Sequence, residues 1–97
     1  MLVAFSVTPI GTGDPSVADE VADAVRVVRT SGLPNRTGAM FTEIEGEWDH
    51  VMDVVKRAAD AVLQHSGRVS LVLKADIRPG TTNQLDEKVR SVEERLS

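Results

Sequence analysis

The stretch MFTEIEGEWD, Met40 to Asp49, joins a short strand to a helix at a glycine. Side chains alternate between the two faces of a strand, so Phe41, Glu43 and Glu45 would share one face. Two carboxylates at this spacing repel each other and disfavour a sheet. We therefore expect water, a basic side chain or a ligand to offset that repulsion.

The residues after this stretch continue as a helix, a strand and a second helix. Segment 47–65 repeats its apolar residues at helical spacing, and segment 68–77 alternates like a strand. Thr81 and Gln84 have the spacing of a capping box, which predicts the start of the last helix. The predicted apolar stripe of helix 47–65 is Trp48, Val51, Met52, Val55, Ala59, Val62 and Leu63. The predicted stripe of the last helix is Leu85, Val89, Val92 and Leu96.

The residues before the stretch form a strand, a helix and an additional weak strand. Segment 2–8 alternates, with its apolar face at Val3, Phe5 and Val7. Ser16 is expected to begin a helix, and Gly32 is a suitable residue to end it. The turn residues Thr37-Gly38 then favour a hairpin between a strand at 34–37 and a better strand at 40–45.

The order of these elements predicts an α+β fold. Strand, helix, strand, strand, helix, strand is the ferredoxin-like βαββαβ sandwich, to which this chain adds a C-terminal helix. Residues 1–97 would form a single ferredoxin-like domain. Right-handed crossovers place the first two helices on one face of the sheet. The other face has no cover within the chain, so we expect a second subunit to cover it.

Composition excludes several classes of protein. The net charge of −4 argues against a nucleic-acid binder, which usually carries a basic patch. The absence of cysteine excludes disulfides, thiolate zinc sites and a cysteine nucleophile. The apolar run at the N-terminus has no basic residue before it and stops at Pro9, unlike a signal peptide or a membrane span. A cytoplasmic location is the default expectation.

Few residues have the pattern of a catalytic or metal site. His50 and His65 lie fifteen residues apart on one predicted helix and cannot share a metal ion within one chain. No histidine is paired with a serine nucleophile in a recognisable setting. The sequence PIGTG at 9–13 lacks the Gly-Lys-Ser/Thr ending of a phosphate-binding loop, and a tight turn is the better interpretation. Phe5 is the only aromatic residue of its strand, which disfavours an RNA-recognition domain.

Charged residues at the ends of two strands remain to be explained. Glu43 and Glu45 end one strand, and Lys74, Asp76 and Arg78 alternate along another. These residues suit cross-strand ion pairs on a solvated or subunit-covered face, and such pairs are individually weak. They suit equally a polar pocket in which carboxylates hold an amine-bearing or cationic ligand. The spacing leaves both interpretations open.

Four segments of the chain resemble a known family in the same order and spacing. They are VAFSVTPIGTGDPSVADEVADAV, GAMFTEIEGEWDHVMDVV, RVSLVLKADIR and KVRSVEERL. The family they resemble is the thiamine-binding protein family of the YkoF-like superfamily. Its Thr-x-Ile-Glu-Gly motif matches Thr42, Ile44, Glu45 and Gly46, its small loop matches Pro9, Gly11 and Gly13, and its acidic-then-Arg strand end matches Asp76 and Arg78. Phe41 stands where the family usually has glycine.

The resemblance implies a function without catalysis. Some members bind thiamine or its hydroxymethylpyrimidine part, and the family assembles through the sheet into dimers and tetramers. We accordingly expect a homodimer or homotetramer that binds thiamine or the pyrimidine precursor, with no required cofactor, no catalytic residue, no metal, and neither nucleic acid nor membrane as a partner. The residues implied as ligand-binding are Ser6, Thr8, Phe41, Thr42, Glu43, Glu45, Asp76 and Arg78.

Each group of this set suits one part of thiamine. A carboxylate suits the amino group and the cation, a hydroxyl such as that of Thr42 or Ser6 suits a ring nitrogen, and an aromatic face suits the thiazolium. The alternative is an ACT-type regulatory domain, which shares the topology and senses amino acids at a subunit interface. A dimeric α+β barrel enzyme is disfavoured because both histidines lie on a helix.

Overall fold

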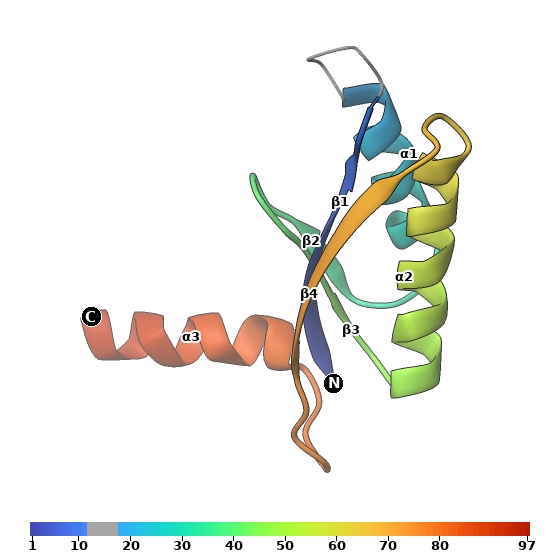
Figure 1. Cartoon of the computed structure of the whole chain (residues 1–97). Helices are drawn as coiled ribbons and strands as arrows, with labels where there is room; N and C mark the ends of the chain where they lie inside the picture. Colours follow the sequence, from blue (N-terminus) through green and yellow to red (C-terminus); the bar gives the residue numbers. More distant parts are fainter. Residues whose placement is uncertain (12–17) are drawn as a thin grey trace.

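A four-stranded antiparallel sheet in the order β2-β3-β1-β4 forms the centre of the molecule (Figure 1). The computed structural model describes residues 1–11 and 18–97. The elements are β1 (Leu2–Pro9), α1 (Ala18–Arg29), β2 (Asn35–Thr37), β3 (Thr42–Glu45), α2 (Trp48–Leu63), β4 (Val69–Asp76) and α3 (Gln84–Leu96). This order and pairing confirm the ferredoxin-like fold with an additional C-terminal helix. The predicted helix start at Ser16 and the matched Gly13 lie outside the described residues.

The central strand β1 pairs over different lengths with its two neighbours. All eight of its residues pair with β4, from Leu2 opposite Asp76 to Pro9 opposite Val69. Only its first half pairs with β3, from Leu2 opposite Glu45 to Phe5 opposite Thr42. The second half of β1 therefore extends beyond the β2–β3 hairpin.

Both α1 and α2 pack on the sheet face that carries Val3, Phe5 and Ile44, as the crossovers predict. The valine side chains of the two helices fill the space above this face. The buried residues of α2 are Val51, Val54, Val55, Ala58 and Val62. The predicted stripe was therefore wrong at both ends, where Trp48 is 53% exposed and Leu63 is 40% exposed, and it missed Val54 and Ala58. Helical side chains tilt toward the N-terminus, so Trp48 in the first turn points past the end of the helix.

The opposite face of the sheet is partly covered by α3, so the prediction that it has no cover within the chain was wrong in part. Leu85 in the first turn of α3 is buried. Asp86 pairs with Arg36 of β2 at 2.9 Å, and Lys88 pairs with Asp76 of β4. Beyond Lys88, α3 runs away from the rest of the molecule (Figure 1). Its remaining apolar residues, Val89, Val92 and Leu96, are exposed.

Candidate functional site

The eight predicted ligand-binding residues lie at four different places. Ser6, Thr8, Phe41 and Thr42 line one cavity between β1, α1 and the β2–β3 hairpin, which we call the hairpin cavity. Glu43 and Asp76 line a separate hollow on the opposite sheet face. Glu45 is buried beneath the start of α3, and Arg78 lies at a hollow beside α3. The structure therefore brings the hydroxyls and the aromatic ring together and leaves the charged residues apart from them.

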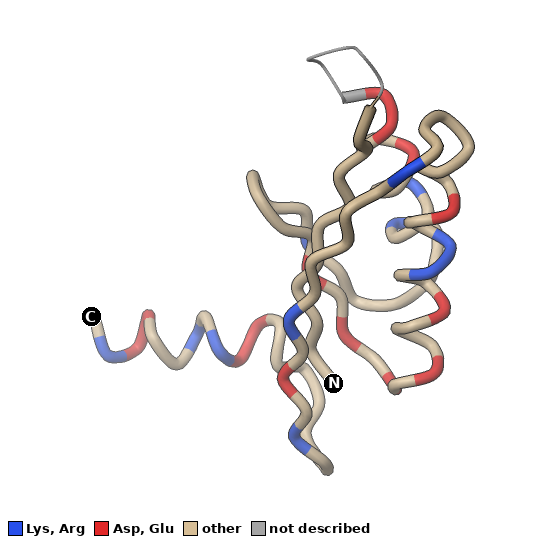
Figure 2. The backbone as a smooth tube through the Cα atoms, in the orientation of Figure 1, with Lys and Arg blue, Asp and Glu red and all other residues tan. Residues whose placement is uncertain are grey.

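The hairpin cavity has a volume of about 170 Å³ and an uncharged lining in the part of the chain described. Its walls come from β1, from the inner face of α1 and from the tip of the hairpin. The lining residues are Phe5, Ser6, Val7, Thr8, Val21, Ala24, Val25, Val28, Thr37, Gly38, Ala39, Met40, Phe41 and Thr42. Figure 2 shows that β1, which forms one wall of this cavity, carries no acidic or basic residue, whereas the helices carry many.

The turn of the hairpin shapes this cavity. The Gly38 N–H donates to the Phe41 carbonyl oxygen at 2.9 Å, so the chain reverses just before β3 begins at Thr42. A Cβ atom at Gly38 would lie only 2.9 Å from that oxygen, which explains the need for glycine there. Phe41 is 39% exposed and stands at the rim of the cavity, where its ring can contact a ligand and solvent together.

Glu45 has a structural partner that sequence reasoning assigned to the wrong helix. Because Glu45 directly precedes Gly46 and the helix that starts near Trp48, the sequence predicts that its carboxylate lies near the N-terminal amides of that helix. It instead accepts hydrogen bonds from the amides of Gln84 at 2.8 Å and Leu85 at 3.1 Å, in the first turn of α3. The predicted capping box of α3 is absent from the described contacts, because the Thr81 hydroxyl donates to the Arg78 carbonyl oxygen. A carboxylate at a helix N-terminus is also favoured by the helix dipole.

The remaining charged residues on the open sheet face compensate one another. Glu43 lies opposite Ala4 in register and shares its hollow with Lys74 and Lys88. The hydrogen bond from Lys88 is the main reason that the pKa of the Asp76 carboxyl lies below its usual range. The carboxylate repulsion expected in the strand at 40–45 is therefore relieved at Glu45 by the α3 amides, whereas Glu43 faces a hollow that Lys74 and Lys88 also line.

The two histidines do not contribute to the hairpin cavity. His65 Nε2 lies 2.8 Å from the Asp23 carboxylate and links the end of α2 to α1. His50 lines a different hollow, beside Glu45 and Thr81. Within residues 1–11 and 18–97, no group of three or more histidine and acidic side chains is placed to hold a metal ion.

Sequence reasoning missed the α1 wall of the cavity. The helical spacing of Val21 and Val25, with Ala24 beside them, predicts only a stripe that packs on the sheet. The structure places them over the part of β1 that extends beyond the hairpin. The predicted strands 2–8 and 40–45 have nearly equal lengths, so they offered no signal that part of β1 would lack a partner.

Comparison with known proteins agrees with this architecture. Residues 3–93 match the family model described as thiamine-binding protein. A UPF0045 protein of Mycobacterium bovis is 56% identical over 97 residues, which cover 99% of this chain and 94% of the relative. A UPF0045 protein of Methanothermobacter thermautotrophicus is 38% identical, with 95% of each chain covered.

Solved structures show the same fold. A hypothetical protein of Methanocaldococcus jannaschii superposes with a TM-score of 0.86 at 31% identity, covering 96% of this chain and 95% of that one. A candidate thiamine biosynthesis/salvage protein of Thermotoga maritima gives 0.79 at 28% identity, covering 94% and 96%. None of the described helices has the length and apolar character to cross a membrane. The match over nearly the whole chain shows that it belongs to the thiamine-binding protein family.

Proposed function

We propose that this chain is a non-enzymatic binding protein for thiamine or its hydroxymethylpyrimidine part, and that the hairpin cavity holds the pyrimidine ring. The observation that carries the proposal is the convergence of Ser6, Thr8, Phe41 and Thr42 on one cavity with an uncharged lining. Hydroxyls can donate to or accept from a heterocycle, and the apolar walls of α1 can enclose its flat faces.

Size and charge favour the pyrimidine ring as the enclosed part. A volume of 170 Å³ is smaller than the roughly 300–1,000 Å³ of pockets for drug-sized ligands, so it suits one ring better than two. Burying the thiazolium cation without a carboxylate beside it would be unfavourable. Thiamine would therefore leave its thiazolium at the rim, where Phe41 can make a cation–π contact.

The comparisons support a binding role. The family is named for thiamine binding, and the Thermotoga maritima relative is named for thiamine biosynthesis or salvage. The described lining of the hairpin cavity contains no histidine, carboxylate or lysine that would act as a general acid or base.

Calorimetric titration with thiamine, hydroxymethylpyrimidine and a panel of amino acids tests the proposal. Thr42→Val removes a lining hydroxyl at nearly constant shape and should weaken binding of the pyrimidine about tenfold. Thr82→Val is the matched control, because Thr82 lies at a separate hollow near α3. Wild-type protein that binds neither thiamine nor the pyrimidine at millimolar concentration would remove the proposal.

An ACT-type sensor of amino acids is the second candidate, and the hollow on the open sheet face favours it. Glu43 and Asp76 lie there with Lys74 and Lys88, and such a mixture could hold both charged groups of an amino acid. This function predicts heat with one of the amino acids in the panel. Glu43→Gln would abolish that heat and leave pyrimidine binding unchanged.

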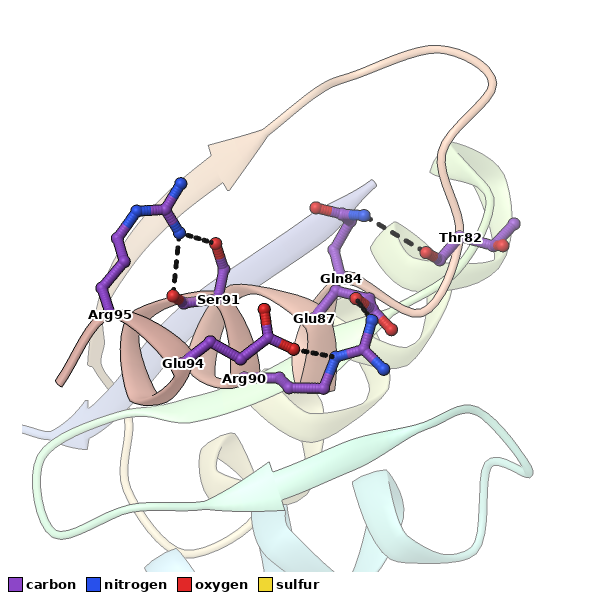
Figure 3. Close-up of polar contacts among 7 residues, drawn as sticks. All are labelled: Thr82, Gln84, Glu87, Arg90, Ser91, Glu94 and Arg95. Atoms are coloured by element: carbon purple, nitrogen blue, oxygen red, sulfur yellow. Dashed lines mark hydrogen bonds and ion pairs between the residues drawn. The ribbon is translucent and has the colours of Figure 1, made fainter. Parts of the chain in front are cut away.

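Assembly into a homodimer or homotetramer is a further element of the proposal. The polar side of α3 is occupied within the helix itself, where Arg90 contacts Glu87 and Glu94, and Arg95 contacts Ser91 (Figure 3). Its apolar side is exposed, Val92 by 56%, and lies next to the partly covered sheet face. A second copy of the chain would bury both surfaces.

Light scattering tests the assembly directly. We expect a mass of two or four times 10.5 kDa at micromolar concentration. Val92→Lys should shift the protein toward the monomer because it places a charge on the apolar side. Glu93→Lys introduces the same residue at the neighbouring, exposed position and should leave the mass unchanged. A wild-type monomer would contradict this part of the proposal.

A further inference from the structure

We infer that the backbone N–H and C=O of Val7 recognise the amidine edge of the ligand, meaning the exocyclic amine and the adjacent ring nitrogen of an aminopyrimidine. The inference rests on the proposed function and names the group that gives its site specificity. It starts from the shape of the cavity. Ser6 and Thr8 point to the opposite face of β1 from Phe5 and Val7, yet all four line the same cavity. Residues of both faces can line one cavity only at the edge of the strand.

The hydrogen-bond pattern shows which backbone groups lie on that edge. Met1 and Gly46 exchange both backbone bonds, at 2.9 and 3.0 Å, so the odd-numbered residues of β1 direct their N–H and C=O groups toward β3. On the other side, the Ile10 N–H donates to the Arg68 oxygen, so the even-numbered residues face β4. Val7 therefore directs both of its backbone groups away from β4 and toward the β3 side.

Among residues 1–11 and 18–97, no strand pairs with Val7 on that side. The pairing of β1 with β3 ends at Phe5 opposite Thr42, and the residue that would oppose Val7 is Met40. Met40 lies within the turn closed by Gly38 and Phe41, and it does not continue the strand. Within the described residues, neither backbone group of Val7 has a protein hydrogen-bond partner on this edge. Both groups face the hairpin cavity.

The chemistry of this edge matches one class of ligand. In a hydrogen-bonded antiparallel pair, each residue donates its N–H to the opposing residue and accepts a hydrogen bond from that same residue at its C=O. The N–H and C=O of Val7 therefore form one donor–acceptor pair on the same side of the strand. An aminopyrimidine offers the complementary pair, because its ring nitrogen accepts and its neighbouring amine donates. Ala24, Val25 and Val28 line the cavity beside this edge, so a ligand seated there displaces water, and a backbone group that the ligand does not match is left unsatisfied.

Two analogues of hydroxymethylpyrimidine test the inference on the wild-type protein. One replaces the exocyclic amine by a methyl group, and the other replaces the adjacent ring nitrogen by CH. We expect the first to bind roughly 10- to 100-fold more weakly and the second about tenfold more weakly than the parent compound. If the parent binds and both analogues bind equally well, the Val7 inference is wrong and the proposed function stands. If the parent does not bind, both fall.

Two variants assign the effect to Val7 itself. Val7→Pro removes the N–H, which takes no part in pairing with β4, and proline is tolerated at such an edge. The variant should bind the parent and the CH analogue with equal affinity. Val7→Ala keeps the N–H and should retain the tenfold preference for the parent. A Val7→Pro protein that folds by circular dichroism and keeps the preference would overturn the inference, and if it fails to fold, the wild-type analogue series decides.

Discussion

The N-terminus of α3 depends on one buried carboxylate, and Glu45→Gln tests that dependence. Glu45 is only 7% exposed and bonds to two backbone amides at 2.8 and 3.1 Å. Glutamine keeps one oxygen as an acceptor and directs an NH₂ group toward the second amide. The substitution therefore removes one hydrogen bond and the negative charge that strengthens the other.

The size of the effect follows from those two bonds. A hydrogen bond to a charged group contributes about 1.5–3 kcal/mol. We expect the substitution to lower the free energy that holds α3 against the sheet by about 2 kcal/mol. The equilibrium constant for the detachment of α3 would then rise roughly 30-fold. Among the elements of the sheet, α3 packs mainly on β3, so the helix should open without unfolding the sheet.

Hydrogen exchange followed by mass spectrometry measures this opening. Peptides that cover 84–96 should exchange about 30-fold faster in Glu45→Gln, while peptides from β1 keep their wild-type rates. Glu43→Gln is the control, because Glu43 lies on the same face of β3 and has no hydrogen bond or ion pair to any described residue. Equal exchange of α3 in the two variants would refute the capping role of Glu45.

Three further changes test the cavity and the contact between the helices. Gly38→Ala forces a Cβ to 2.9 Å from the Phe41 oxygen, so thermal unfolding should show a loss of about 1–3 kcal/mol, and an unchanged stability would contradict the tight turn. Phe41→Gly should weaken thiamine binding about fivefold by calorimetry through loss of the cation–π contact, whereas tighter binding would mean that Phe41 only blocks the cavity. The hydrogen bond from Arg26, and to a smaller extent that from His65, lowers the pKa of Asp23 from its ordinary value of 3.8. The ionised Asp23 carboxylate therefore stabilises the folded protein above that pH, and this stabilisation is lost as the pH falls further. Asp23→Asn should flatten this part of the curve of stability against pH, and an unaltered curve would contradict the assignment.

The sequence predicted those features of the fold that depend on local pattern. The alternation through Val3, Phe5 and Val7 identified the face of the sheet that packs on the helices, and the turn at Gly38 identified the hairpin. The Glu45 cap could not be predicted, because its partners lie about forty residues away and backbone amides leave no mark in a sequence. The exposure of Trp48 could not be predicted in the same way. Helical spacing shows on which side of a helix a residue lies, but it does not show how far along the helix the sheet and the neighbouring helix extend.

The short length of β3 connects the fold to the proposed function. Two more paired residues at its start would give the Val7 backbone a protein partner and fill the cavity edge. The sheet would then be more regular, and it would offer a ligand no free donor and acceptor. The hairpin instead turns at Gly38 and leaves this edge to the cavity. Because a ligand can supply the missing bonds, we expect binding to stabilise the protein in proportion to ligand concentration, and the early turn to be a feature of the binding site.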